Sequence, residues 1–505
     1  MSPVTSTKVV IIGAGPAGLT AGYLLSKAQV PVAVLEGDPQ YVGGISKTAT
    51  YKGYHFDIGG HRFFSKSQEV EDLWSEILPD DLLVRPRSSR ILYRQQFFTY
   101  PLKGGEALTK LGILESLRCG FSYFWAQLFP VRKPRSFEDW VSNKFGHRLF
   151  SIFFKTYTEK VWGMSCREIS ADWAAQRIKG LSLTTAVLAA LFPKRKPRSG
   201  AEVVKTLIDS FRYPRLGPGM MWDACAARMR AHGGALEMGR RVTGCHYDSD
   251  RQLWTVTSCD ADGGEHIVEA EHVISTAPVR ELCGMLEPPV SEVTARAAEQ
   301  LKYRDFITVV LILKDRSAFA DNWIYIHDPS VMVGRVQNFK SWSPEMVPDP
   351  ATTCYGLEYF CFEHGTGLWS YSDEQLENLG REEIVKLGLA RVEDILDAHV
   401  VRQRKAYPVY DDAYAGHLLT IRKELEGRFP TLHLVGRNGM HKYNNQDHSM
   451  MTAMLCVKNI LAAERIYDLW EVNEDAEYHE SGNHSVSVSG MRQVPQRIES
   501  AEVKR

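Results

Sequence analysis

A glycine-rich turn near the start of the chain has the spacing that phosphate binding requires. Residues 13–18 read Gly-Ala-Gly-Pro-Ala-Gly, so Gly13, Gly15 and Gly18 follow the order Gly-x-Gly-x-x-Gly. The first glycine permits a tight turn, the second lets the backbone approach a pyrophosphate, and the third lets a helix pack on a strand. Glu36 follows about twenty residues later, where a carboxylate can accept hydrogen bonds from ribose hydroxyls. The pattern predicts a bound dinucleotide, either NAD or FAD; the alternative is an ordinary glycine turn that binds nothing.

The flanking residues form the elements that must hold this turn. Lys8 to Ile12 is a short β-branched run typical of a buried strand, and Leu19 to Lys27 has the pattern of a helix. Val30 to Leu35 is a second apolar run of strand length. Strand, turn, helix and strand within about thirty residues are the expected opening of a dinucleotide-binding fold, in which the helix N-terminus offers free N–H groups to the phosphates.

The rest of the chain changes character twice. Long helical patterns rich in Leu, Phe and Trp follow position 104, and strand patterns such as FITVVLIL dominate after about position 302. We therefore predict an α/β fold in which two domains are inserted into a discontinuous nucleotide-binding domain. The predicted ranges are 1–103, 206–300 and 405–470 for the nucleotide-binding domain, 104–205 for a helical insertion, 301–404 for an antiparallel β-sheet substrate domain, and 471–505 for a polar, disordered tail.

Length and composition exclude several classes of protein. The 505 residues are enough for about three domains, and 60 Lys and Arg against 61 Asp and Glu argue against a broad nucleic-acid-binding surface. The nine cysteines form no CxxC pair, so neither a disulfide scaffold nor a metal site is expected. The N-terminus lacks the apolar core of a signal peptide, and the longest apolar runs, such as Leu183 to Phe192, are too short to span a bilayer. We expect a cytoplasmic protein with no membrane or nucleic-acid partner.

Further motifs resemble known flavoproteins. The pair Gly43-Gly44, the segment Asp57 to His61 (DIGGH) and Arg437 resemble the superfamily of amine oxidases and protoporphyrinogen oxidases, which implies a GR2-type Rossmann-like domain with tightly bound FAD. Four longer segments resemble one branch of it, the UDP-galactopyranose mutases. They are YHFDIGGHRFFSKS (54–67), YTEKVWGMSCREISADWAAQR (157–177), NWIYIHDPSVMVGRVQNFKSWSP (322–344) and GRNGMHKYNNQDHSMM (436–451), and Tyr407 in AYPVY matches a family tyrosine.

The resemblance to the mutases implies a reaction and roles for individual residues. Reduced FAD, the active form, attacks the anomeric carbon of a nucleoside-diphosphate (NDP) sugar through N5, the diphosphate leaves and returns, and the sugar recloses through a different hydroxyl. A reductant such as NAD(P)H is then needed. The implied catalytic residues are His61, beside the flavin, and the diphosphate-binding Arg177 and Arg335. The implied substrate-binding residues are Trp162, Tyr325, Tyr407, Tyr443 and Asn445. The implied FAD-binding residues are Gly13, Gly15, Ala17, Gly18, Glu36, Gly44, Gly60, His61, Arg437 and Gln446.

Each of these assignments has a plainer alternative. Arg177 and Arg335 could be surface residues, His61 a structural loop histidine, and Trp162 part of a core. The three tyrosines could be core aromatics with a satisfied hydroxyl, and Asn445 could serve a turn or helix cap.

Three functions remain open at this point. The leading one is a flavin-dependent pyranose–furanose mutase acting on an NDP-sugar. The second is an FAD-dependent oxidoreductase of the amine oxidase or protoporphyrinogen oxidase type, which would need no arginines aimed at a diphosphate. The third is a non-catalytic module like the Rab GDP-dissociation inhibitors that share this fold, although an intact glycine turn with Glu36 argues against it. The sugar, the base, the reductant and the oligomeric state are not specified.

Overall fold

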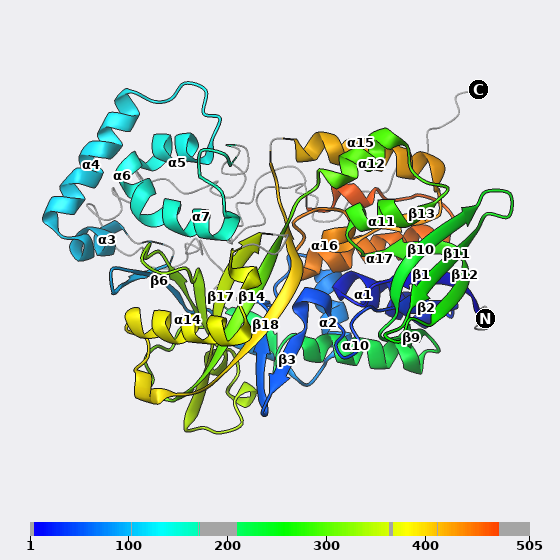
Figure 1. Cartoon of the computed structure of the whole chain (residues 1–505), viewed down its shortest axis with the longest axis horizontal. Coiled ribbons are helices and arrows are strands. Elements are labelled where there is room, and N and C mark those ends of the chain that lie inside the picture. The colour runs from blue at the N-terminus through cyan, green and yellow to red at the C-terminus, as the bar shows by residue number, and fades with distance from the viewer. Residues whose placement is uncertain are drawn as a thin grey trace, which may run out of the picture.

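A computed structural model describes residues 5–473 apart from 101, 103, 170, 172–209, 363–366 and 412. These residues build two large sheets with helices on their faces and a separate helical unit at one end (Figure 1).

The first sheet is organised around the N-terminal strand. Within the described residues it has eight strands, in the order β13 (Leu286–Glu287), β10 (Arg241–Asp248), β11 (Leu253–Cys259), β12 (Glu265–Ser275), β1 (Thr5–Ile12), β2 (Val32–Leu35) and β9 (Ala235–Glu237), with β19 (Leu432–Leu434) paired to β12. β1 runs parallel to both neighbours, with Ile11 opposite Val34 on β2 and Ile274 on β12.

Side-chain alternation along β1 explains why this sheet is covered on both faces. Val9 and Ile11 lie in one apolar core, whereas Val10 and Ile12 lie in the core on the opposite face. The first core is covered by α1 (Pro16–Lys27), α2 (Gln68–Ile77), α10 (Gly219–Ala231) and α17 (Gln446–Ala462). The second is covered by α11 (Val279–Met285), α12 (Glu292–Glu299) and α15 (Tyr414–Arg428). The result is the layered α/β arrangement that the sequence predicted (Figure 1).

The second sheet is built from longer strands. Its order is β18 (Ile395–Pro408), β14 (Tyr303–Lys314), β17 (Thr352–Phe362), β16 (Arg335–Asn338), β15 (Trp323–Ile326), β6 (Ser89–Tyr93) and β7 (Gln96–Thr99). All neighbours pair antiparallel except β15 and β6, which are parallel. α14 (Asp373–Lys386) covers one face, and the other face packs against the hairpin of β3 (Thr48–Tyr51) and β4 (Tyr54–Asp57) and the pair of β5 (Leu82–Pro86) and β8 (Ser210–Pro214).

The strands of the second sheet do not all come from the range predicted for it. β6 and β7 lie within 1–103, and β18 runs across the predicted boundary between positions 404 and 405. The physical reason is that β6 pairs with β15 across a chain separation of more than two hundred residues, which no local pattern reports.

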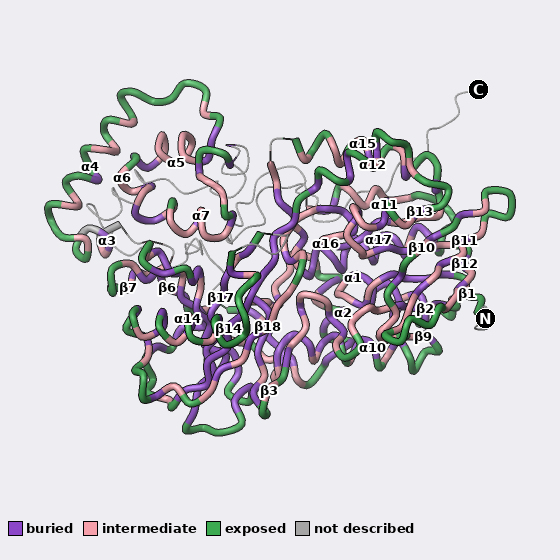
Figure 2. Tube along the Cα trace, viewed as in Figure 1, coloured by how far each residue is buried: buried purple, intermediate pink, exposed green. Residues whose placement is uncertain are grey.

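The helical unit packs beside the second sheet. It comprises α3 (Gly104–Leu111), α4 (Ile113–Leu128), α5 (Phe137–Phe145), α6 (His147–Phe150), a π-helical turn (Ser151–Lys155) and α7 (Thr156–Trp162). Most of the predicted insertion after position 171, and the tail after 473, lie outside the described residues. In the part of the chain that is described, no helix combines the length and the apolar content needed to cross a bilayer. Figure 2 shows the sheet strands largely buried and α4 largely exposed.

Candidate functional site

The glycine turn after β1 is shaped by close backbone contacts. Gly13 has φ +95°, and a Cβ there would lie 2.2 Å from Thr276 Oγ1. A Cβ on Gly18 would lie 1.9 Å from the Gly13 carbonyl oxygen, so both positions exclude a side chain. Gly15 differs, because the nearest atom to its ideal Cβ is the Cα of Gly44, at 4.0 Å. Gly15 and Gly44 therefore border open space where α1 begins without a side-chain cap, which lets a ligand approach the helix N-terminus.

Glu36, directly after β2, is fixed by the backbone around it. Its Oε2 accepts a hydrogen bond from the Ala14 N–H at 2.6 Å, and its Oε1 accepts one from the Asp38 N–H at 2.8 Å. Burial raises the pKa of Glu36 above its ordinary value, against the lowering effect of these two bonds. Each oxygen keeps a second lone pair, so the group can still accept hydrogen bonds from a diol.

The C-terminal segment packs on the turn and carries the predicted residue Arg437. A Cβ on Gly436 would lie 3.1 Å from the Ala17 Cβ, so α1 packs directly on the start of α16 (Gly436–Gly439). Arg437 donates from Nε to the Asn444 carbonyl at 2.8 Å and from Nη1 to the Ala406 carbonyl at 3.0 Å. Its guanidinium is thus held between β18 and the loop before α17.

The segment Gly59-Gly60-His61 lies where the two sheets meet. An ideal Cβ on Gly59 would be 3.5 Å from His61 Cε1 and 3.9 Å from the Tyr407 hydroxyl, and one on Gly60 would be 3.4 Å from Gln337 Oε1. Residues of the first domain therefore contact strands β16 and β18 of the second sheet. This junction is where the predicted cofactor and substrate residues come together.

His61 is half-buried at this junction, and its imidazole is electrically neutral. Burial, followed by the positive charges of Arg437 and Arg335, lowers its pKa to about 3. Its Nδ1 is buried, and so is Oε1 of Gln446, whose Nε2 donates to the Arg62 carbonyl at 3.0 Å. Neither buried atom has a hydrogen-bond partner among the described residues. Both are available to polar groups of a ligand.

Arg335 is oriented by a carboxylate on the neighbouring strand. Tyr325 on β15, Arg335 on β16 and Glu358 on β17 stand directly opposite one another, so the three side chains share one face of the sheet. The Nε of Arg335 donates to Glu358 Oε2 at 2.6 Å, and Gln337 Nε2 donates to the other carboxylate oxygen. Burial lowers the pKa of Arg335, but the adjacent Glu358 outweighs this and raises it well above its ordinary value.

The terminal nitrogens of this guanidinium remain available. Arg335 is partly exposed, at 17 %, whereas Glu358 is fully buried. Among the described residues, neither Nη1 nor Nη2 of Arg335 makes a hydrogen bond to the protein. A side chain that is held at Nε and open at its other two nitrogens presents a fork suited to an oxyanion.

Two stacked tyrosines lie beside Arg437, and one of them, Tyr407, also interacts electrostatically with Arg335. The rings of Tyr407 and Tyr443 are stacked, with centroids 5.6 Å apart, and Arg437 Cζ lies 5.4 Å and 5.1 Å from the two ring centroids. Burial raises the pKa of Tyr407 above its ordinary value, so its hydroxyl stays protonated and can donate.

A second aromatic group completes the other side. Tyr157 on α7 lies edge-on to Tyr325, with centroids 5.2 Å apart, and stacks on His327 at 5.3 Å. Burial raises the pKa of Tyr157, and the charge of Arg335 opposes that rise, which places the phenol within electrostatic reach of the guanidinium.

Two predicted residues have other surroundings. Trp162 is buried in the core of the helical unit with Phe137 and Phe150, because the inner face of α7 packs there. This is the placement of a core residue and not of a pocket residue. Asn445 is the N-cap of α17, and its backbone N–H donates to His448 Nδ1 at 3.2 Å. Arg177 lies outside the described residues.

The structure also adds residues that the motifs did not single out. Glu358 holds Arg335, Gln337 donates to Glu358, and Tyr157 contacts the rings of Tyr325 and His327. Glu358 had a detectable signal, since it is a carboxylate within the apolar run CYGLEYFCF, and a charge in a buried strand needs a partner. Tyr157 had none, because its position depends on how α7 packs on β15.

The assembled group can bind an anion with hydroxyl-bearing substituents. Two guanidinium groups, phenol donors and a neutral imidazole form one half-buried surface, and charge-assisted hydrogen bonds from a guanidinium to an oxyanion are stronger than neutral ones.

Comparison with known proteins agrees with this arrangement. Residues 16–438 match the family described as flavin containing amine oxidoreductase. Among solved structures, reduced UDP-galactopyranose mutase superposes with a TM-score of 0.75 at 21% identity, covering 90% of this chain and 94% of that one. A putrescine oxidase mutant superposes with a TM-score of 0.61 at 16% identity, covering 92% and 100%. At these identities the likeness concerns the fold.

One curated relative matches locally. The inactive all-trans-retinol 13,14-reductase of Danio rerio is 49% identical over 72 residues, which are 14% of this chain and only 11% of that protein. The chain therefore spans about a tenth of the length of the curated relative it matches.

Proposed function

The chain belongs to the family of flavin-containing amine oxidoreductases, and from that premise we propose that it is a flavin-dependent mutase interconverting pyranose and furanose forms of an NDP-sugar. The proposed cofactor is FAD in its reduced form.

The residues at the glycine turn fit a flavin dinucleotide. Gly15 and Gly44 leave backbone-lined space at the start of α1, where a pyrophosphate would meet free N–H groups. Glu36 would accept hydrogen bonds from the ribose, and His61 and Gln446 hold unpartnered buried atoms near the junction of the sheets. A reduced flavin bound there would supply a nucleophile for the anomeric carbon.

The observation that carries the proposal is the state of Arg335. Its guanidinium is held at Nε by Glu358 while both terminal nitrogens lack protein partners in the described chain. A diphosphate is the leaving group that such a fork would hold after the sugar bond breaks and keep in place for its return. Tyr407, Tyr443 and Tyr157 would add neutral donors, which strengthen the hold without further charge.

The same geometry argues against a substrate amine. The stacked Tyr407 and Tyr443 rings already have a cation beside them, since Arg437 lies within 5.5 Å of both centroids. A protonated amine would meet Arg437 and Arg335 as like charges. His61, neutral at physiological pH, adds no charge and would position a sugar hydroxyl or the flavin by hydrogen bonding.

A binding experiment tests this substrate class. UDP and putrescine are titrated separately into the flavin-loaded protein, with flavin absorbance and calorimetry as readouts. We expect UDP to bind and putrescine not to bind. Arg335→Ala should weaken UDP binding, whereas Arg391→Ala, at an exposed arginine of the same domain, should not. Tight putrescine binding, or UDP binding unaffected by Arg335→Ala, would contradict the proposal.

A further inference from the structure

Helix α4 exposes a continuous apolar surface. Among the described residues, 18 large apolar side chains are exposed, and nine of them lie between positions 113 and 131. We name this surface the α4 apolar face; its residues are Ile113, Leu114, Leu117, Phe121, Phe124, Trp125, Leu128, Phe129 and Val131. Ile113, Phe121 and Phe124 are 83%, 72% and 63% exposed. A patch of this size on a protein surface marks an interaction site.

The opposite side of α4 faces inward and makes polar contacts beside the buried Cys119, while Gln127 makes one at the exposed edge of the helix. Glu115 pairs with Arg148 on α6, and the Arg148 N–H donates to Ser122 Oγ at 3.0 Å. Gln127 Nε2 donates to the Asn143 carbonyl at 2.8 Å. A surface helix normally buries its apolar stripe and exposes its polar one, and α4 does the reverse.

The orientation of α4 is fixed by these contacts. A Cβ on Gly146 would lie 2.6 Å from the backbone nitrogen of Tyr123, so the α4 backbone is pressed against the α5–α6 junction. Cys119 is 5% exposed and packs with Phe98 and Phe153 of the core beneath. Rotating α4 to bury its apolar side would break all of these contacts.

Positive charge flanks the α4 apolar face. Arg118 lies on the helix and is exposed. Arg132, Lys133 and Arg135, in the segment after the helix ends at Leu128, are exposed as well. Between positions 113 and 135 the one acidic residue is Glu115, which faces inward and is paired. The sequence pattern LFPVRKPR at 128–135 recurs as LFPKRKPR at 191–198. An apolar stretch followed by a basic cluster is therefore present twice in the sequence.

We propose that α4 lies on the surface of a bilayer containing anionic phospholipid, with its apolar face in the boundary between headgroups and acyl chains. Phe, Trp and Leu on one side with Arg and Lys at the edge are the features of helices that bind in this plane. Anionic headgroups complement the basic cluster, whereas a purely apolar protein partner would leave it unmatched. The expectation of no membrane partner rested on the lack of a segment long enough to cross a bilayer. A helix of 16 residues can bind at the bilayer surface without crossing it.

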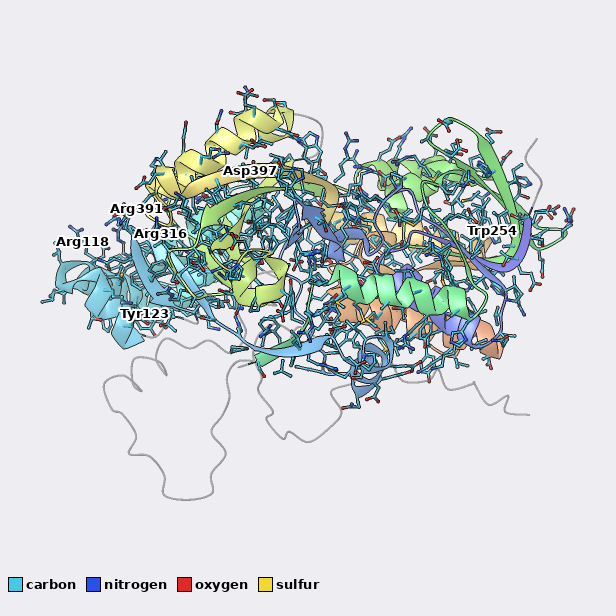
Figure 3. The ribbon with its side chains drawn as sticks, turned by 90° about the horizontal axis from the view of Figure 1, so that it is seen from below. Arg118, Tyr123, Trp254, Arg316, Arg391 and Asp397 are labelled. Carbon is cyan, nitrogen blue, oxygen red and sulfur yellow. The ribbon has the colours of Figure 1, made fainter. Side chains whose placement is uncertain are left out.

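Bilayer contact at α4 would leave the rest of the molecule in water. Figure 3 places Arg118 and Tyr123 at one end of the molecule and Trp254, on β11, near the other. The core under α4 reaches Tyr325, so the substrate side of the site, and not the first sheet, would lie toward the bilayer.

Vesicle flotation of the full-length, flavin-loaded protein tests this proposal. The vesicles are phosphatidylcholine alone or phosphatidylcholine mixed with phosphatidylglycerol. We expect the protein to float with the mixed vesicles, to float less with phosphatidylcholine, and to lose binding as salt rises. Phe121→Ser/Phe124→Ser/Trp125→Ser should lower the partition coefficient at least about tenfold. Arg132→Glu/Lys133→Glu should lower the partition coefficient for the mixed vesicles, which are anionic, and leave the one for pure phosphatidylcholine unchanged.

A matched control is available on other surfaces. Val293, Val392 and Leu419 are exposed to similar extents, at 69%, 71% and 67%, and lie outside the helical unit. Their triple serine variant should float like the natural protein. Thermal unfolding and light scattering are recorded for every variant.

Three results would overturn the proposal. The first is no flotation of the natural protein with either vesicle. The second is a lower melting temperature for the α4 triple variant but not for the control triple variant, which would mean that the α4 apolar face is covered within the monomer. The third is a dimer that the α4 triple variant converts to monomer without a change in flotation, which would assign the face to a second copy.

Discussion

The ion pair between Arg335 and Glu358 gives the sharpest test of the site, because stability and binding should respond to it differently. In Arg335→Met the carboxylate of Glu358 stays fully buried and keeps only the amide of Gln337 as a partner. Removing one member of a buried pair costs about 3–5 kcal/mol of unfolding free energy. Since Arg335 is 17% exposed, we expect a value near the lower end, about 3 kcal/mol.

Adding Glu358→Gln should restore most of that loss. Exchanging both members of a buried pair for neutral groups of similar volume is often close to neutral, and the new amide oxygen can still accept from Gln337. UDP binding should not recover, because the guanidinium is absent from both variants. The expected loss is about 2–5 kcal/mol, which is at least about thirtyfold in Kd.

The double-mutant cycle consists of the natural protein, Arg335→Met, Glu358→Gln and the double variant. Each is measured by urea denaturation for stability and by calorimetry for UDP binding. UDP affinity at the natural level in the double variant would refute the assignment of Arg335 to the diphosphate. A double variant no more stable than Arg335→Met would refute the view that an uncompensated Glu358 causes the instability.

Three further outcomes follow from the geometry. Gly18→Ala should prevent stable folding, because its Cβ would lie 1.9 Å from the Gly13 carbonyl, whereas Gly15→Ala, with 4.0 Å of clearance, should fold normally yet retain less flavin by absorbance. Burial raises the pKa of Asp57 from 3.8 to about 8, so its protonated form stabilises the fold below pH 3.8 and that contribution is lost as pH rises through 8. Asp57→Asn should flatten this part of the stability–pH curve, and an unchanged slope would contradict the shift. Trp162→Ala should cost about 3–5 kcal/mol of stability and leave UDP affinity unchanged; a selective loss of UDP binding would return Trp162 to the pocket.

Local sequence was sufficient for the nucleotide turn and insufficient for the substrate side. The role of Gly18 depends on a contact with Gly13, five residues earlier, so spacing alone predicted it, whereas the contact of Gly13 with Thr276 joins distant parts of the chain. The support of Arg335 by Glu358 depends on the register of β16 against β17, which the chain sequence does not display. Trp162 shows the same limit, since a motif position does not tell which side of α7 faces the core.

The inverted helix α4 shows why burial cannot be read from polarity alone. Its apolar residues have ordinary helical spacing, and such a stripe on a surface helix normally faces the core. Only the packing of Glu115 and Ser122 against α6 reveals that the apolar side faces out.

The central claim, that the flavin serves isomerisation and not net oxidation, is tested most directly by anaerobic turnover of UDP-galactopyranose and related NDP-sugars. We expect dithionite-reduced protein to form the furanose isomer over many turnovers with no net consumption of reducing equivalents, and oxidised protein to form none. Stoichiometric oxidation of a substrate by the oxidised protein, with no isomer from the reduced protein, would contradict it.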